Sequence, residues 1–83
     1  MNFANHVKIR NEKFGTVVFD TLTEKIFITD QVGAEILRLI EQSRNLPEII
    51  DVLSSNYDGE RQTIEKDIFE FVGQLKSNNI ICV

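Results

Sequence analysis

Residues 25–37, which read KIFITDQVGAEIL, decide the fold of this chain. The start of this segment is mostly β-branched or aromatic, and such side chains favour a strand. Thr29 or Asp30 can then cap a helix by accepting a hydrogen bond from a backbone N–H group of its first turn. An apolar stripe at helical spacing follows, made by Val32, Ile36, Leu37 and Ile40. The segment therefore predicts a short strand that turns directly into an amphipathic helix.

Two more strands are expected before this segment. Residues 7–10 alternate apolar and charged side chains, which indicates a strand with one wet face. A polar turn at residues 11–13 leads to residues 15–20, where strong β-formers predominate. Because the connections are short, the strands at 7–10, 15–20 and 25–29 are predicted to form an antiparallel meander.

Three helices are expected after the sheet. The first covers residues 30–42. The second has Asn45 as its N-cap and Pro47 in its first turn, where the missing N–H group costs nothing, and it ends near Asn56. The third covers residues 60–77 and has a core stripe made by Ile64, Ile68, Phe71, Val72 and Leu75.

Residues 80–83 either return to the core or add a short strand. The order of the elements predicts an α+β, winged-helix-like fold, in which a three-stranded antiparallel β-meander is followed by three helices. At 83 residues the chain is expected to form a single domain, residues 1–83, with one modest core.

The charge balance argues against nucleic acid as a partner. The formal net charge is −4, and the third helix carries more acidic than basic residues, so it would repel a phosphate backbone. The apolar runs are far shorter than the ~20 residues that span a bilayer. Residues 1–10 have no apolar core of the kind a secretion signal needs. We therefore expect a cytoplasmic protein that binds neither nucleic acid nor membranes.

The sequence lacks the residue combinations that catalysis needs. His6 is the only histidine, so no Ser, Cys or Asp nucleophile has a base beside it. Cys82 is the only cysteine, so the chain offers neither an internal disulfide nor a metal-binding cluster of Cys and His. We expect a protein that is not an enzyme and has no catalytic residue, metal site or cofactor. His6 is predicted to be a surface residue in a loose N-terminal segment.

The remaining candidate is a peptide-binding surface on the third strand. If this strand is an edge, its outer N–H and C=O groups can pair with an extended peptide. The third helix offers a wall beside it, on which Phe69 is either an apolar anchor or a residue at the margin of the core. Acidic residues on this helix favour a peptide with Lys or Arg. The predicted peptide-binding residues are Lys25, Ile26, Phe27, Ile28 and Thr29 on the strand, and Glu65, Asp67, Ile68, Phe69, Val72 and Lys76 on the helix.

The sequence resembles the PqqD-like family, whose members are called RiPP recognition elements. In that family an aromatic-containing strand ends in a Leu-Asn pair, and the helix that follows has small residues in its second turn. Here Phe27, Thr29-Asp30 and Gly33-Ala34 occupy these places. Residues 46–53 and 67–75 are similar to the second and third helices of the family. The resemblance covers nearly the whole chain.

The resemblance implies a function as well as a fold. Members of the family bind the N-terminal leader of a ribosomally made precursor peptide, which adds beside the third strand and packs against the third helix. They present the leader to a modifying enzyme, such as a radical SAM maturase, a leader peptidase of a lasso-peptide system or a cyclodehydratase. The chain is therefore expected to be a non-catalytic adaptor. The alternative is a winged-helix interaction or regulatory module with no role in peptide maturation.

Overall fold

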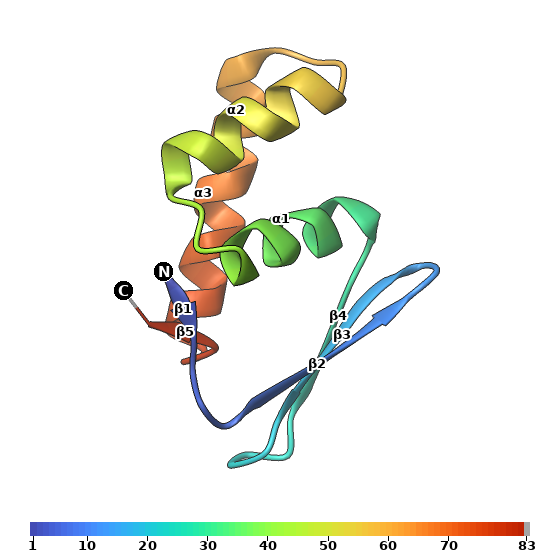
Figure 1. The fold of residues 1–83 in the computed structure, drawn as a ribbon, viewed down its shortest axis with the longest axis vertical. Coiled ribbons are helices and arrows are strands. Elements are labelled where there is room, and N and C mark those ends of the chain that lie inside the picture. Colours follow the sequence, from blue (N-terminus) through green and yellow to red (C-terminus); the bar gives the residue numbers. More distant parts are fainter. Residues whose placement is uncertain (83) are drawn as a thin grey trace.

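The computed structural model describes residues 1–82 and has the predicted α+β architecture. Three antiparallel strands form a sheet in the order β2-β3-β4, and three helices follow it (Figure 1). The strands are β2 (Val7–Glu12), β3 (Gly15–Asp20) and β4 (Ile26–Thr29), and the helices are α1 (Gln31–Glu41), α2 (Leu46–Asn56) and α3 (Arg61–Ser77). The predicted winged-helix-like order, a meander followed by three helices, is confirmed.

The first hairpin is tighter than the sequence predicted. The polar turn expected at residues 11–13 is wrong, because β2 continues to Glu12, which pairs with Gly15. A side-chain hydrogen bond accounts for the extension. The Thr16 hydroxyl donates to Asn11 Oδ1 over 3.0 Å, so a polar residue is satisfied inside the strand pair.

Side-chain caps fix where the first two helices begin. The Asp30 carboxylate accepts a hydrogen bond from Gly33 N over 2.9 Å, so Asp30 rather than Thr29 is the N-cap of α1. At α2, Glu48 N donates to Asn45 Oδ1 over 2.9 Å and Asn45 N donates to Glu48 Oε1 over 3.1 Å, which is a reciprocal capping box. The predicted Asn45 cap is confirmed. Because Asp30 follows β4 immediately, the end of β4 and the first turn of α1 form one corner.

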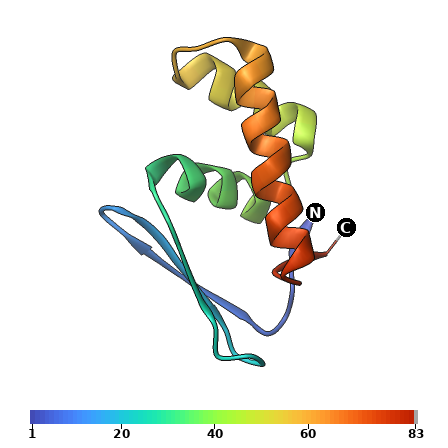
Figure 2. The ribbon, with the colours of Figure 1, turned by 180° about the vertical axis from the view of Figure 1, so that it is seen from behind.

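The two ends of the described chain lie side by side (Figures 1 and 2). β1 (Asn2–Phe3) pairs with β5 (Ile81–Cys82) in a second, two-stranded antiparallel sheet. A short strand was one of two possibilities for residues 80–83, and it is present at Ile81–Cys82; Val83 lies outside the described residues. The expectation of a loose N-terminal segment is wrong, because pairing with β5 gives its backbone hydrogen-bond partners.

His6 is also less exposed than predicted. Its side chain is 20% exposed, and Nε2 lies 3.6 Å from Oδ2 of the buried Asp20. Asp20 Oδ1 accepts hydrogen bonds from the backbone N–H groups of Leu22 and Thr23, over 2.9 and 3.1 Å. Burial raises the pKa of the Asp20 carboxyl, but the bonds from Thr23 and Leu22 outweigh burial and hold the pKa below its ordinary value of 3.8. Asp20 therefore stays charged and closes the turn after β3.

The core lies between the inner face of the sheet and the helices. Val18, in the middle of β3, is fully buried and packs into one cluster with α1, α2 and α3. In Figure 1, α1 lies above the sheet and α3 runs behind α1 and α2; Figure 2, seen from behind, brings α3 to the front. The outer face of the sheet carries exposed apolar side chains, namely Phe19, Ile26 and Ile28.

Candidate functional site

β4 is an edge strand. It pairs with β3 on one side, and no other described strand pairs with its second side. Asp20 N donates to Lys25 O over 2.9 Å, so the backbone carbonyl of Lys25 points toward β3. Bonding direction alternates along an antiparallel strand, so the N–H and C=O groups of Ile26 and Ile28 point away from β3. β4 therefore presents backbone donors and acceptors along its outer edge.

A groove lies between β4 and α3, on the inner side of this edge, and we call it the edge groove. Its volume is about 310 Å³. Ile26–Thr29 line it from β4, and Phe71, Gln74, Leu75 and Asn78 line it from α3. An extended peptide paired with β4 would place every second side chain toward this groove, because side chains alternate between the two faces of a strand.

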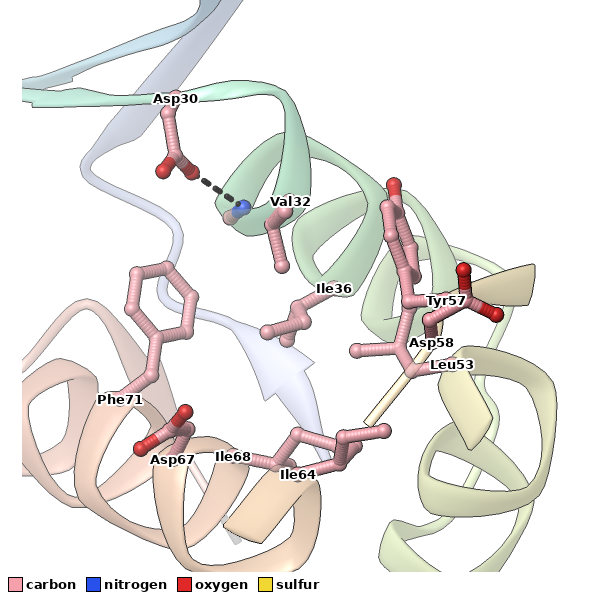
Figure 3. Close-up of a pocket in the computed structure, with 11 residues that line it drawn as sticks. Asp30, Val32, Ile36, Leu53, Tyr57, Asp58, Ile64, Asp67, Ile68 and Phe71 are labelled. Carbon is pink, nitrogen blue, oxygen red and sulfur yellow. Dashed lines mark hydrogen bonds between the residues drawn. The ribbon is translucent and has the colours of Figure 1, made fainter. Parts of the chain in front are cut away.

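A second cavity, which we call the terminal cavity, lies beyond the end of β4, at the first turn of α1 (Figure 3). Its volume is about 470 Å³. Figure 3 shows Val32, Ile36, Ile64 and Phe71 around a common space, with the carboxylates of Asp30, Asp58 and Asp67 at its border. The terminal cavity therefore has apolar walls and an acidic rim.

Tyr57 completes one side of the terminal cavity. Its hydroxyl donates to Glu35 Oε2 over 2.9 Å, and Asn56 Nδ2 donates to Glu35 Oε1 over the same distance. The hydrogen bond to Glu35 raises the pKa of Tyr57 above 10.0. These contacts hold the aromatic ring against α1 and fix the cavity wall where α2 ends.

Phe71 belongs to both the edge groove and the terminal cavity. A Cβ atom at Gly33 would lie 3.3 Å from Phe71 Cζ and 2.8 Å from Thr29 Cβ, so α1, β4 and the phenyl ring approach closely only because Gly33 has no side chain. The two spaces therefore share one aromatic wall, and together they follow β4 to its end.

The structure places some of the predicted site residues on this surface. Ile26, Phe27, Ile28 and Thr29 line the edge groove, and Lys25 immediately precedes β4. Asp67 and Ile68 line the terminal cavity. The residues predicted on the strand thus lie together beside a groove.

The other helix residues do not line this surface. Glu65 and Phe69 line a separate hollow, and at about 100° per residue Phe69 lies about 160° around α3 from Phe71. Lys76 lies on the same side as Phe69 by the same spacing. Val72 is 2% exposed and belongs to the core. Phe69 and Val72 therefore do not line the edge groove, because β4 runs along the opposite side of the core stripe.

Several lining residues were missed by sequence reasoning. Phe71 had a signal, since Asp67 and Gln74 are polar neighbours on one side of it and mark it as the margin of the core stripe. Tyr57 and Asp58 had none, because their position depends on how the connection between α2 and α3 folds back. The missed residues include Asp30, Val32, Tyr57, Asp58, Phe71, Gln74 and Asn78.

Other kinds of site were also sought. Among residues 1–82, no group of three His, Cys, Asp or Glu side chains is placed to hold a metal ion. In the same part of the chain, no helix combines the length and the apolar character needed to cross a membrane. Cys82, in β5, is exposed, and its thiol is free.

The fold and the open edge define a small winged-helix-like domain with an edge strand beside an apolar groove. The chain belongs to the PqqD family: residues 15–81 match the family described as "Coenzyme PQQ synthesis protein D (PqqD)". The resemblance inferred from the sequence is thereby confirmed. A relative called "PqqA binding protein", from Gluconobacter oxydans (strain 621H), is 26% identical over 81 residues, which are 98% of this chain and 84% of that protein.

Two solved structures have the same fold. "TbiB1 in Complex with the TbiA(beta) Leader Peptide" matches with a TM-score of 0.90 and 26% identity, over 96% of this chain and 93% of that one. "Lasso peptide synthetase B1 complexed with the leader peptide" matches with a TM-score of 0.90 and 21% identity, over 99% and 96% of the two chains. Both structures were solved in complex with a leader peptide.

Proposed function

We propose that this protein is a non-catalytic adaptor that binds the leader of a ribosomally synthesised precursor peptide. The observation that carries the proposal is the open edge of β4 beside the edge groove. The leader adds as a strand, bonding to the outward backbone groups of Ile26 and Ile28. Its alternate side chains enter the edge groove and pack against Phe71 and Leu75.

Similar proteins support this proposal. The relative from Gluconobacter oxydans is named for binding PqqA, and TbiB1, at 26% identity, was solved with a leader peptide. The match to TbiB1 covers 96% of this chain, so it includes the strand and the helix that form the edge groove. The common fold supports leader binding by this chain, and the open edge of β4 supports strand addition as its mode.

The adaptor presents the bound leader to a modifying enzyme, such as a radical SAM maturase or a lasso-peptide leader peptidase. It carries out no chemistry itself, since the sequence pairs no nucleophile with a base. We infer that residues 1–83 work as one domain in the cytoplasm, without a cofactor, nucleic acid or membrane.

The alternative is an interaction module with no peptide ligand. It is favoured by one observation, the exposed apolar side chains of Phe19, Ile26 and Ile28 on the outer face of the sheet. The two functions use different parts of β4. Peptide capture uses its backbone edge, whereas a protein partner on the outer face would use its exposed side chains.

Hydrogen exchange tests the proposal directly. The probe is the leader of a precursor peptide encoded beside the gene where there is one, and otherwise a peptide selected from a random library for binding to this chain. Strand addition slows exchange of the Ile26 and Ile28 amides, because their N–H groups become hydrogen bonded. Unchanged exchange at both amides with the peptide bound would rule out strand addition.

A pair of variants separates the backbone edge from the side chains. Ile28→Pro removes an outward donor and is tolerated best at an edge strand, so it lowers peptide affinity by about tenfold or more while the fold persists. Ile28→Thr keeps the donor and removes the apolar side chain, so it leaves affinity nearly unchanged. Circular dichroism checks folding first. If Ile28→Thr lost affinity as strongly as Ile28→Pro, the outer-face alternative would be favoured.

A further inference from the structure

The N-terminal and C-terminal parts of the chain differ in net charge. Residues 1–29, which contain the sheet, have four basic and three acidic residues, whereas residues 30–83 have five basic and ten acidic residues. The edge groove therefore runs from a nearly neutral sheet toward an acidic helical half. Any peptide that follows β4 to its end reaches the terminal cavity at this acidic side.

The terminal cavity concentrates that charge around apolar walls. Its lining includes Asp30, Asp58 and Asp67 but no Lys, Arg or His. None of the ion pairs found among the described residues involves these three carboxylates. Asp30 Oδ1 is occupied as the N-cap of α1, while Asp58 and Asp67 are exposed at the rim. The rim is therefore negative and lacks a cation of its own.

The walls below this rim are suited to a large apolar side chain. Val32 is 40% exposed, although it stands in the apolar stripe of α1, so it borders the empty space rather than the packed core. Phe71 is half-buried and forms the shared wall with the edge groove. Figure 3 shows the apolar side chains between the carboxylates, so an apolar peptide residue can fill the space while a cation beside it in the peptide reaches the rim.

We propose, resting on the leader-binding function above, that the terminal cavity is a second subsite that selects the sequence of the peptide. It takes one large apolar side chain, and the rim carboxylates bind a Lys or Arg within about two residues of it, since a strand advances only ~3.3 Å per residue. Pairing with β4 is independent of sequence, so this subsite supplies selectivity at the end of the strand.

A selection from random peptides tests the proposal without knowledge of the natural leader. The probe is a displayed library of random peptides, selected against the wild type and against the Asp58→Asn/Asp67→Asn variant. The wild-type pool is expected to be enriched in an apolar residue with Lys or Arg at a fixed, short spacing. The variant pool keeps the apolar residue and loses the enrichment in Lys and Arg.

A second double variant is the matched control. Glu41→Gln/Glu65→Gln removes the same net charge from positions that do not line the terminal cavity, so its pool should match the wild-type pool. Asp30 is left unchanged because it caps α1. A wild-type pool without enrichment in Lys and Arg overturns the proposal, as does enrichment that persists in Asp58→Asn/Asp67→Asn.

Single peptides then give the size of the effect. For one selected peptide and its Lys→Gln counterpart, the wild type prefers Lys by about three- to tenfold at low salt, and high salt reduces the preference. The preference shrinks toward onefold in Asp58→Asn/Asp67→Asn. Binding of the same peptide to Ile28→Pro separates the two proposals. Loss of this binding supports strand addition, whether or not the wild type prefers Lys over Gln. Binding that is unaffected by Ile28→Pro argues against the leader-binding mode itself.

Discussion

The two sides of α3 carry similar residues and have different surroundings. The groove flank, made by Asp67, Phe71, Gln74 and Asn78, faces β4 and the terminal cavity. The open flank, which includes Glu65, Phe69, Gly73 and Lys76, lies on the other side of the core stripe. Each flank has a phenylalanine, but only Phe71 has β4 and α1 opposite it. The helix sequence alone does not determine which phenylalanine belongs to a site, because that depends on where the sheet is placed.

The largest expected effect is the difference in stability between a variant of the core and a variant of the open flank. Ile68→Ala should lower the free energy of unfolding by about 2–5 kcal/mol, since it leaves a cavity in the packed cluster. Phe69 is 49% exposed, and Phe69→Ala should change the same free energy by no more than about 0.5 kcal/mol. Urea denaturation measures both. A loss of several kcal/mol in Phe69→Ala would mean that the open flank is covered in solution.

The next effect separates the two flanks by peptide affinity. Phe71→Ala should weaken binding of the leader by about 2 kcal/mol, or roughly thirtyfold, because it removes the wall shared by both spaces. Phe69→Ala, the matched control, should change affinity by less than about twofold. Fluorescence anisotropy with a labelled peptide measures both, after denaturation has shown that each variant is folded. The reverse order of the two losses would contradict the site described above.

The strand-to-helix corner could be predicted from the sequence because its signals are local. The β-branched and aromatic side chains of residues 25–29 identify β4, and the sequence limits the helix cap to Thr29 or Asp30. The core stripe of α3 is equally local, as Ile68 and Leu75 show. The groove flank could not be predicted in the same way, since the sequence assigns Phe71 to the stripe and places Phe69 beside it, whereas in the structure Phe71 is half-buried and lines the site. Choosing between them needs the position of β4 in space, which is a tertiary property.

Two glycines extend the comparison of the flanks to smaller changes in stability. Gly33, on α1, faces Phe71 of the groove flank, and Gly73 lies on the open flank. Gly33→Ala would bring a Cβ atom within 2.8 Å of Thr29 Cβ. The crowding costs about 1–3 kcal/mol and is offset in part by the better helix propensity of Ala, which leaves a net loss of stability on the order of 1 kcal/mol. Gly73 on the open flank has nothing within 4 Å of such an atom, so Gly73→Ala should gain about 1 kcal/mol. Melting temperatures that moved in the same direction would refute this difference between the flanks.

The smallest effect concerns Asp20, which lines neither the edge groove nor the terminal cavity. Its pKa is lowered in the folded protein by the hydrogen bonds from Thr23 and Leu22, against the effect of burial. A carboxyl with a lowered folded-state pKa adds stability that is fully present above its unfolded-state pKa, and that is lost as the pH falls through the folded-state pKa. Acidification below the ordinary value of 3.8 should therefore weaken folding through Asp20. Variants of both flanks should share this loss.

Asp20→Asn isolates this contribution. The asparagine oxygen can still accept from Leu22 and Thr23, so the turn persists, but it does not titrate. The stability difference between wild type and Asp20→Asn should be greatest near neutral pH and should shrink as the pH falls below about 4. Urea midpoints at several pH values measure it. If wild type and Asp20→Asn lost stability in parallel on acidification, Asp20 would not be the source. The acid sensitivity would then have to come from other carboxylates. Glu48, whose pKa is lowered by hydrogen bonds from Asn45 N and from Arg44, would be the next to replace.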